Sequence, residues 1–140
     1  MDYVRSVPNI TIEGALELVK AAMAEARKKG LKYSVAVVDA SMTLIAFGKD
    51  DGATPHSVET SRRKANTAAS TGKATGWMSS ELAVSLPMAS GNLLTNIPGG
   101  VPIRFKGSLV GGLGVAGGTV EDDAAIAKSA LAAIGSDEVK

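Results

Sequence analysis

The sequence contains no cysteine and a single histidine, and these two scarcities limit the chemistry that the chain can support. Without cysteine there are no disulfides, zinc–thiolate sites, iron–sulfur clusters, thiol nucleophiles or thioether-linked haem. Any bound metal must therefore take its ligands from histidine, carboxylate, methionine, tyrosine or threonine side chains. His56 is the one imidazole available, which makes it our candidate metal ligand.

Long apolar runs and a charge excess are also missing. No stretch approaches the ~18 consecutive apolar residues of a membrane helix, and the first residues do not resemble a signal peptide, so we expect a cytoplasmic protein without a membrane partner. Fifteen lysines and arginines against fourteen acids give a net charge of +1. This balance argues against a nucleic-acid-binding surface, which normally needs a strong basic excess.

What remains is the composition of one folded domain spanning residues 1–140. Hydrophobic residues make up 45% of the chain and charged residues 21%, which is far from the composition of a disordered segment. Periodicity, capping residues and turn residues predict the order helix, hairpin, helices, hairpin, helix. The predicted helices cover residues 11–30, 55–71, 79–86 and a last segment from about 120, and the predicted strands cover 33–39, 43–47, 101–105 and 108–116. Two hairpins joined through helices favour an α+β fold, with an antiparallel sheet flanked by helices.

The segment from Gly112 to Gly117 has the spacing of a dinucleotide-binding fingerprint, G-x-G-x-x-G, and it lies between a predicted strand and a predicted helix. Only 23 residues follow Gly117, too few for the remainder of a dinucleotide-binding fold. We therefore interpret these glycines as structural positions that let a helix or a neighbouring subunit approach the strand closely.

Four types of charged or titratable residue are candidates for a site. His56 begins the second long predicted helix, where it is either a ligand or general base, or an exposed residue without function. Arg62, Arg63 and Lys64 follow one another on that helix and point about 100° apart, so they cannot all face one ligand. Lys64 borders the small residues of the helix and is the better candidate to meet an anion in a pocket. Asp39 ends an apolar strand, where turn capping is a more common role than catalysis.

Several segments resemble the haem-binding (haem-degrading) GlcG/HbpS-like family, which also occurs as the C-terminal domain of PduO-type proteins. The C-terminal half carries the most specific part of the resemblance, and the first half agrees with it. The segments are Val37-Val38-Asp39, Asp51-Gly52-Ala53, Lys64-Ala65 with Thr67-Ala68, Asn96 to Ile103, Gly107 to Gly118, and Asp122-Asp123. The resemblance implies an antiparallel sheet of roughly five strands covered by helices. It also implies a homo-oligomer, often an octamer, that binds haem and in some members sequesters haem or iron.

Our leading hypothesis is a cytoplasmic homo-oligomer that binds haem or a related tetrapyrrole near residues 51–64. His56 would supply or support an axial ligand, and Lys64 or Arg63 would pair with a propionate. Arg104 is a further cationic candidate for cofactor binding.

Two alternatives from other classes stay open. In the first, the protein is an enzyme or accessory factor acting on a small hydroxy acid, diol or aldehyde. The catalytic candidates are then His56, Asp39 and Lys64, with His56 as general base and Lys64 or Arg104 as anion anchor. In the second, it is a structural or sensory interaction module without a small ligand.

Overall fold

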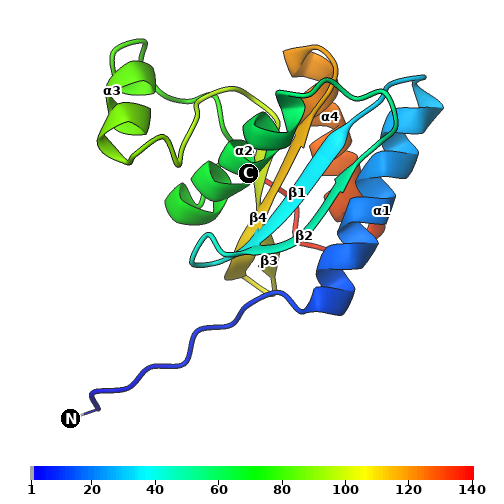
Figure 1. Cartoon of the computed structure of the whole chain (residues 1–140). Helices are drawn as coiled ribbons and strands as arrows, with labels where there is room; N and C mark the ends of the chain where they lie inside the picture. Colours follow the sequence, from blue (N-terminus) through cyan, green and yellow to red (C-terminus); the bar gives the residue numbers. More distant parts are fainter. Residues whose placement is uncertain (1) are drawn as a thin grey trace.

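A four-stranded antiparallel sheet forms the centre of the fold, and helices cover both of its faces (Figure 1). The computed structural model describes residues 2–140. The strands lie in the order β2-β1-β4-β3, so the two predicted hairpins meet through the pairing of β1 with β4. The elements are α1 (Ile12–Lys28), β1 (Ser34–Asp39), β2 (Leu44–Lys49), α2 (Ser57–Thr71), α3 (Leu82–Ala89), β3 (Gly100–Phe105), β4 (Ser108–Ala116) and α4 (Val120–Ala133).

The expected α+β class and antiparallel pairing are confirmed, but the expected number of about five strands is too high. Within residues 2–140 the sheet has four strands. The long connection between α2 and β3 contains α3 and loops instead of a further strand. It lacks the alternation of apolar and polar residues that a half-buried strand requires. The described part of the chain also has no helix long and apolar enough to cross a membrane.

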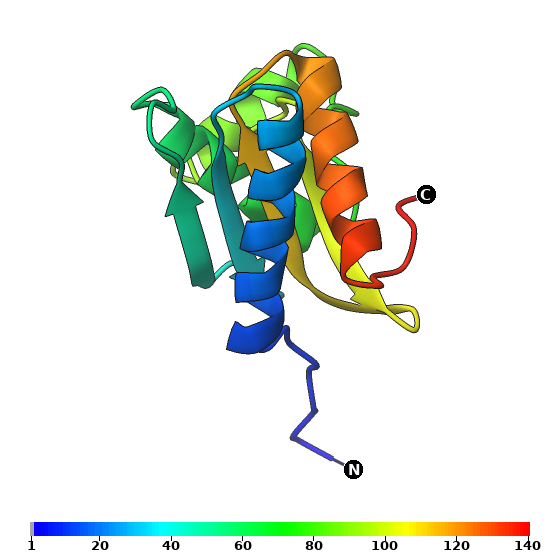
Figure 2. The ribbon, with the colours of Figure 1, turned by 90° about the vertical axis from the view of Figure 1, so that its right-hand side faces the viewer.

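Helices α1 and α4 lie side by side on one face of the sheet and enclose the main hydrophobic core (Figure 2). Leu18 of α1 and Ile126 of α4 are buried there against Val35 and Leu113 of the central strands. Both helices begin at capped ends that the sequence predicted. Thr11 caps α1, and the last helix begins with a capping box. These caps satisfy backbone N–H groups that would otherwise lack partners.

Helix α2 packs on the opposite face, unusually close to β4. A Cβ atom on Gly112 would lie 2.2 Å from the carbonyl oxygen of Ala65, and one on Gly114 would lie 1.9 Å from that of Ser61. Real side chains essentially never make such contacts, so these positions must be glycine. The interpretation of the G-x-G-x-x-G segment as structural is therefore confirmed, and the close approach brings the middle of α2 to the end of the sheet.

Helix α3 differs from its prediction and stands away from the sheet (Figure 1). It spans Leu82–Ala89, whereas the sequence predicted residues 79–86 ending at Pro87. Pro87 lies inside the last turn of the helix, and no residue of α3 is buried. Four of its residues are half-buried and four are exposed, so apolar side chains such as Val84 and Met88 stay at the surface of the described chain.

Candidate ligand-binding pocket

A pocket of about 290 Å³ lies at the end of the sheet where α2 and α4 begin. Its walls come from the first turns of α2, the loop before β3, and the connection from β4 to α4. Its size is near the lower end of the ~300–1,000 Å³ typical of small-molecule sites. The lining residues are Thr54, His56, Ser57, Thr60, Lys64, Ile97, Ala116, Gly117, Gly118, Val120 and Asp123.

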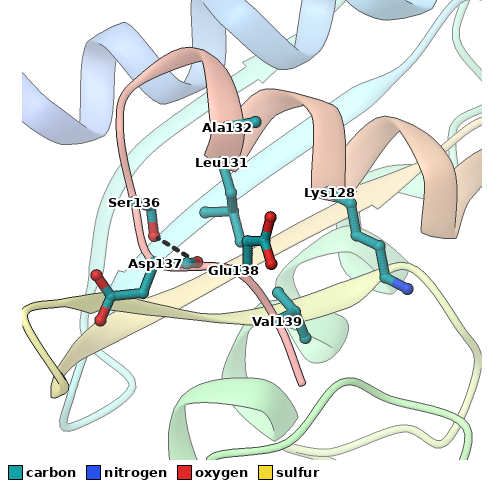
Figure 3. A pocket seen from close by; sticks show the side chains of 7 residues that line it. All are labelled: Lys128, Leu131, Ala132, Ser136, Asp137, Glu138 and Val139. Carbon is teal, nitrogen blue, oxygen red and sulfur yellow. Dashed lines mark hydrogen bonds between the residues drawn. The ribbon is translucent and has the colours of Figure 1, made fainter.

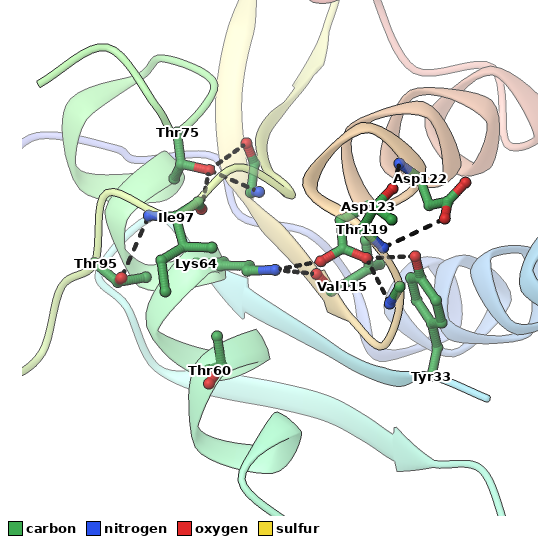
Figure 4. A network of polar contacts seen from close by, with 12 residues as sticks. Tyr33, Thr60, Lys64, Thr75, Thr95, Ile97, Val115, Thr119, Asp122 and Asp123 are labelled. Carbon is green, nitrogen blue, oxygen red and sulfur yellow. Dashed lines mark hydrogen bonds and ion pairs between the residues drawn. The ribbon is translucent and has the colours of Figure 1, made fainter. Parts of the chain in front are cut away.

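The floor of the pocket holds a buried ion pair. Lys64 is 1% exposed and Asp123 is 4% exposed. The Lys64 Nζ atom donates to Asp123 Oδ2 at 2.7 Å and to the carbonyl oxygen of Val115 at 2.8 Å (Figure 4). Lys64 thereby connects α2 to the end of β4 and to the first turn of α4. Gly99 lies beside this amine, and a Cβ atom there would be 2.9 Å from Nζ.

Tyr33, the residue directly before β1, joins the pair. Its side chain is fully buried, and its hydroxyl donates to Asp123 Oδ1, which also accepts from the backbone N–H of Gly118 at 3.1 Å. Both carboxylate oxygens of Asp123 are therefore held by donors, and the carboxylate has one orientation. Burial, followed by the hydrogen bond to Asp123, raises the pKa of Tyr33 above the ordinary tyrosine value, so the phenol stays protonated.

Desolvation acts on Lys64 in the opposite direction. Burial lowers the pKa of Lys64 below the ordinary lysine value, and the hydrogen bond and charge of Asp123 oppose this effect. An ammonium group has three protons, and the contacts among the described residues account for two of them. The floor therefore combines a donor, a fixed carboxylate and a protonated phenol.

His56 lies at the mouth of the pocket, as the N-cap residue of α2. Its side chain is exposed and makes no capping hydrogen bond, whereas its carbonyl oxygen accepts from the N–H and the hydroxyl of Thr60. Ile97 and Val120 also line the pocket and are 46% and 45% exposed. The mouth thus has an accessible imidazole beside two apolar side chains.

The other candidate residues lie elsewhere. Arg63 is on an adjacent face of α2, with its Nε atom 3.8 Å from the carboxylate of Glu59. Arg104 donates to the carbonyl oxygen of Gly72 and borders a different hollow of about 480 Å³. Asp39 accepts from the N–H groups of Ser41 and Thr43, which is the turn-capping role that the sequence favoured. The structure therefore brings His56 and Lys64 together at one pocket, without the other three.

A further hollow of about 250 Å³ lies between α4 and the C-terminal segment (Figure 3). Lys128, Leu131 and Val139 contribute to its lining. None of its charged lining residues is buried, unlike Lys64 and Asp123 in the pocket of His56. Residues 2–140 also contain no group of three histidine or acidic side chains arranged to hold a metal ion.

Sequence reasoning did not assign roles to Tyr33 and Asp123. Asp123 entered only as part of the family resemblance, and Tyr33 only as the start of a strand. A usable signal existed, because Asp123 lies on the same helix face as Ile126, Ala127 and Ala130, which are all buried. An acid on an apolar face indicates a buried partner of opposite charge.

The sheet, its two helical layers and the polar pocket at one end define a small α+β protein with a candidate ligand site. Comparison with known proteins then shows that the chain belongs to the HbpS-like family, described as "Haem degrading protein HbpS-like", whose family model matches residues 10–132. The resemblance to the GlcG/HbpS-like family that the sequence motifs indicated is therefore confirmed.

Individual relatives agree with this assignment. Protein GlcG of Escherichia coli K12 is 33% identical over 102 residues, which cover 72% of this chain and 76% of GlcG. The Klebsiella pneumoniae protein ORFY has a solved structure with a TM-score of 0.88 and 26% identity, covering 99% of both chains. A solved PduOC–haem complex has a TM-score of 0.86 and 28% identity, covering 94% of this chain and 99% of that chain.

Proposed function

We propose that this protein binds haem or a related tetrapyrrole at the mouth of the pocket, with His56 as the ligand to the iron. The observation that carries the proposal is the position of His56, the only histidine of the chain, exposed at the pocket mouth beside Ile97 and Val120. The solved complex of a relative with haem supports the same ligand class. Haem, when bound, supplies an iron centre that accepts an imidazole nitrogen as an axial ligand.

The side chains at the mouth are of the kinds that bind a tetrapyrrole. The pocket itself is large enough for only part of one. An exposed imidazole without a capping hydrogen bond has a nitrogen free to bind metal, and the apolar side chains offer contact to a porphyrin face. A pocket of about 290 Å³ encloses an edge of the macrocycle rather than the whole of it. Most of the ring would therefore lie across the mouth.

A cationic partner for a propionate is needed near the rim. Lys64 is engaged with Asp123 and Val115, so we propose Arg63 for this role, after exchange of Glu59 for the propionate. Arg63 is not a lining residue of the pocket, so it would meet a propionate that extends beyond the lining. Arg104 borders a different hollow and serves as the distant control.

We also propose that the protein acts as a cytoplasmic homo-oligomer, an octamer, that sequesters or degrades haem and thereby handles iron. Exposed apolar side chains on and near α3 support self-association: Trp77 is 43% exposed, Val84 62% and Met88 72%. Light scattering after size-exclusion chromatography measures the number of copies, and cell fractionation measures the location. A monomer at micromolar concentration would contradict the assembly.

The decisive experiment is a hemin titration followed in the Soret region, with wild type and His56→Ala side by side. Wild type should bind saturably, and the variant should show a shifted Soret band and at least about tenfold weaker binding, which corresponds to about 1.4 kcal/mol. Arg63→Ala should weaken binding, and Arg104→Ala should leave it unchanged.

Two results would reject parts of this proposal. Saturable binding with the same spectrum in His56→Ala rules out His56 as the axial ligand. Absence of saturable binding in wild type rules out the haem function itself.

A further inference from the structure

The haem proposal uses the mouth of the pocket and leaves the floor without a role. Lys64 reaches this floor from α2 and is one of the lining residues of the pocket, although its side chain is 1% exposed. A lysine that only joins α2 to β4 and α4 is an uncommon solution, because apolar residues often replace buried ion pairs without loss of stability. The position of this amine therefore calls for a chemical explanation.

The electrostatics of the floor select the kind of ligand that can approach it. Lys64 and Asp123 form an ion pair with no net charge, and the Tyr33 phenol is protonated. Asp123 already neutralises the Lys64 ammonium, so the floor offers a ligand carboxylate no net charge to offset the loss of its hydration. A small uncharged molecule loses far less hydration, and the space of about 290 Å³ is ample for one.

The wall of the pocket adds hydrogen-bonding groups. Thr54, Ser57 and Thr60 line it, and each has a hydroxyl oxygen. The Thr60 hydroxyl donates to the carbonyl oxygen of His56 and has capacity to accept. The Ser57 hydroxyl donates to the carbonyl oxygen of Thr54 and also shares a hydrogen bond with the Ser34 hydroxyl. An uncharged ligand that also bears a hydroxyl group suits this lining.

We propose that Lys64 is a nucleophilic amine that condenses with a small uncharged aldehyde, such as a hydroxyaldehyde, in this pocket. The geometry behind the proposal is the buried amine at the pocket floor, 2.7 Å from a carboxylate that two other donors hold in place. Desolvation favours the neutral amine of a buried lysine, and such lysines act as Schiff-base nucleophiles.

The reaction balances with the groups present. The ammonium of Lys64 transfers one proton to Asp123, and the resulting amine forms a C–N bond with the aldehyde carbon while the carbonyl electron pair moves to oxygen. The oxygen takes up that proton and a second one from the nitrogen, and it leaves as water when the C=N bond forms. The products are an imine on Lys64 and one water molecule, so no oxidant, reductant or cofactor is required.

Tyr33 and the backbone of Gly118 act as positioning groups, since they contact Asp123 rather than the aldehyde. Their two hydrogen bonds hold Oδ1, which leaves Oδ2 directed at the amine. Burial also lowers the pKa of Lys64, which increases the fraction of neutral amine at a given pH relative to an exposed lysine.

This activity is separate from haem binding, because it depends on Lys64 and the floor rather than on His56 and the mouth. The two proposals fail independently. The hemin titration reports the ligand of the iron, whereas chemical trapping of an imine reports the amine.

The test is reductive trapping of the protein at pH 7, without added hemin, using glycolaldehyde and cyanoborohydride. Intact mass and peptide mapping then give the rate of labelling at each lysine. We expect Lys64 to react faster than exposed Lys49, because burial lowers the pKa of Lys64 and so increases its fraction of neutral amine. Lys64→Arg should abolish this rapid label, and Lys49→Arg should not.

Tyr33→Phe is the second variant, because it keeps both members of the ion pair. It should slow labelling at Lys64 while the rate at Lys49 stays the same. Pyruvate, which carries a carboxylate, should label Lys64 more slowly than glycolaldehyde does.

Three outcomes would overturn the inference. Labelling confined to exposed lysines would show that Lys64 has only a structural role. Labelling of Lys64 at the rate of Lys49, or faster labelling by pyruvate than by glycolaldehyde, would contradict the activated amine and the uncharged ligand respectively.

Discussion

Replacing Asp123 by asparagine removes one charge of a buried pair and leaves Lys64 without its counter-ion. Wild-type Asp123 is 4% exposed and Lys64 is 1% exposed, so both charged groups are almost completely withdrawn from bulk solvent. Breaking a buried pair in this way typically costs about 3–5 kcal/mol of the free energy of unfolding. That is a large part of the ~5–15 kcal/mol that stabilises a typical domain.

Loss of the proton from Lys64 sets an upper limit on this cost in free energy. The isolated ammonium can lose its proton, and the free energy required falls by roughly 1.4 kcal/mol for each pH unit towards the ordinary lysine pKa of about 10.4. The limit is therefore about 5 kcal/mol at pH 7 and about 2 kcal/mol at pH 9. Because the folded state then lowers the pKa of Lys64 further, the unfolded chain binds more protons, and the stability of Asp123→Asn rises with pH in this range.

Urea unfolding at pH 7 and pH 9 measures both quantities. We expect Asp123→Asn to lose about 3–5 kcal/mol at pH 7 and at most about 2 kcal/mol at pH 9, relative to wild type at the same pH. Asp122→Asn is the matched control, since this neighbouring carboxylate is 33% exposed, and it should lose no more than about 1 kcal/mol. A loss below about 1 kcal/mol at pH 7 for Asp123→Asn, or one that grows at pH 9, would refute the buried-pair reasoning.

Three further predictions concern packing and pH. Gly114→Ala should destabilise the fold by at least about 3 kcal/mol in urea unfolding, because its methyl group would meet the backbone of α2, whereas Gly48→Ala meets only side-chain atoms and should cost about 1 kcal/mol or less. The bidentate hydrogen bond from Arg27 lowers the pKa of Asp50 to about 2, so this carboxylate stabilises the fold above about pH 4 and ceases to do so as the pH falls towards 2. Arg27→Gln should flatten that part of an acid-unfolding curve, and an unchanged curve would contradict the assignment. The raised pKa of Tyr33 stabilises the fold below about pH 10 and is lost as the pH rises further, so stability should fall less steeply above pH 10 in Tyr33→Phe than in wild type.

Local features of the sequence predicted most of the fold because they act over a few residues. Thr11 caps α1, and Thr119 forms the expected capping box with Asp122. The turn at Lys106-Gly107 joins β3 to β4 as predicted, with positive φ at both residues. Helix α3 was the exception, since an eight-residue helix with no buried face carries no apolar stripe that reveals its bounds.

The site was predictable only in part. His56 and Lys64 were candidates because of their residue types, and both line the pocket. Arg63 and Arg104 were grouped with them by charge alone, and charge does not determine the direction in which a side chain points. Asp39 was correctly interpreted as a turn cap because its partners are two and four residues away.

The sequence by itself determined the element order, the caps, the absence of thiol chemistry and the family, since each depends on residue types or on contacts within a few positions. Only the tertiary structure decided that Lys64, Asp123 and Tyr33 form one buried network. Asp123 is 59 positions from Lys64 and 90 from Tyr33 along the chain. The three side chains meet because glycines on β4 let α2 approach the sheet closely. They also meet because α4 begins at the same end of the sheet. Burial at that edge removes water from the amine and the phenol, and their shifted pKa values are a consequence of this packing.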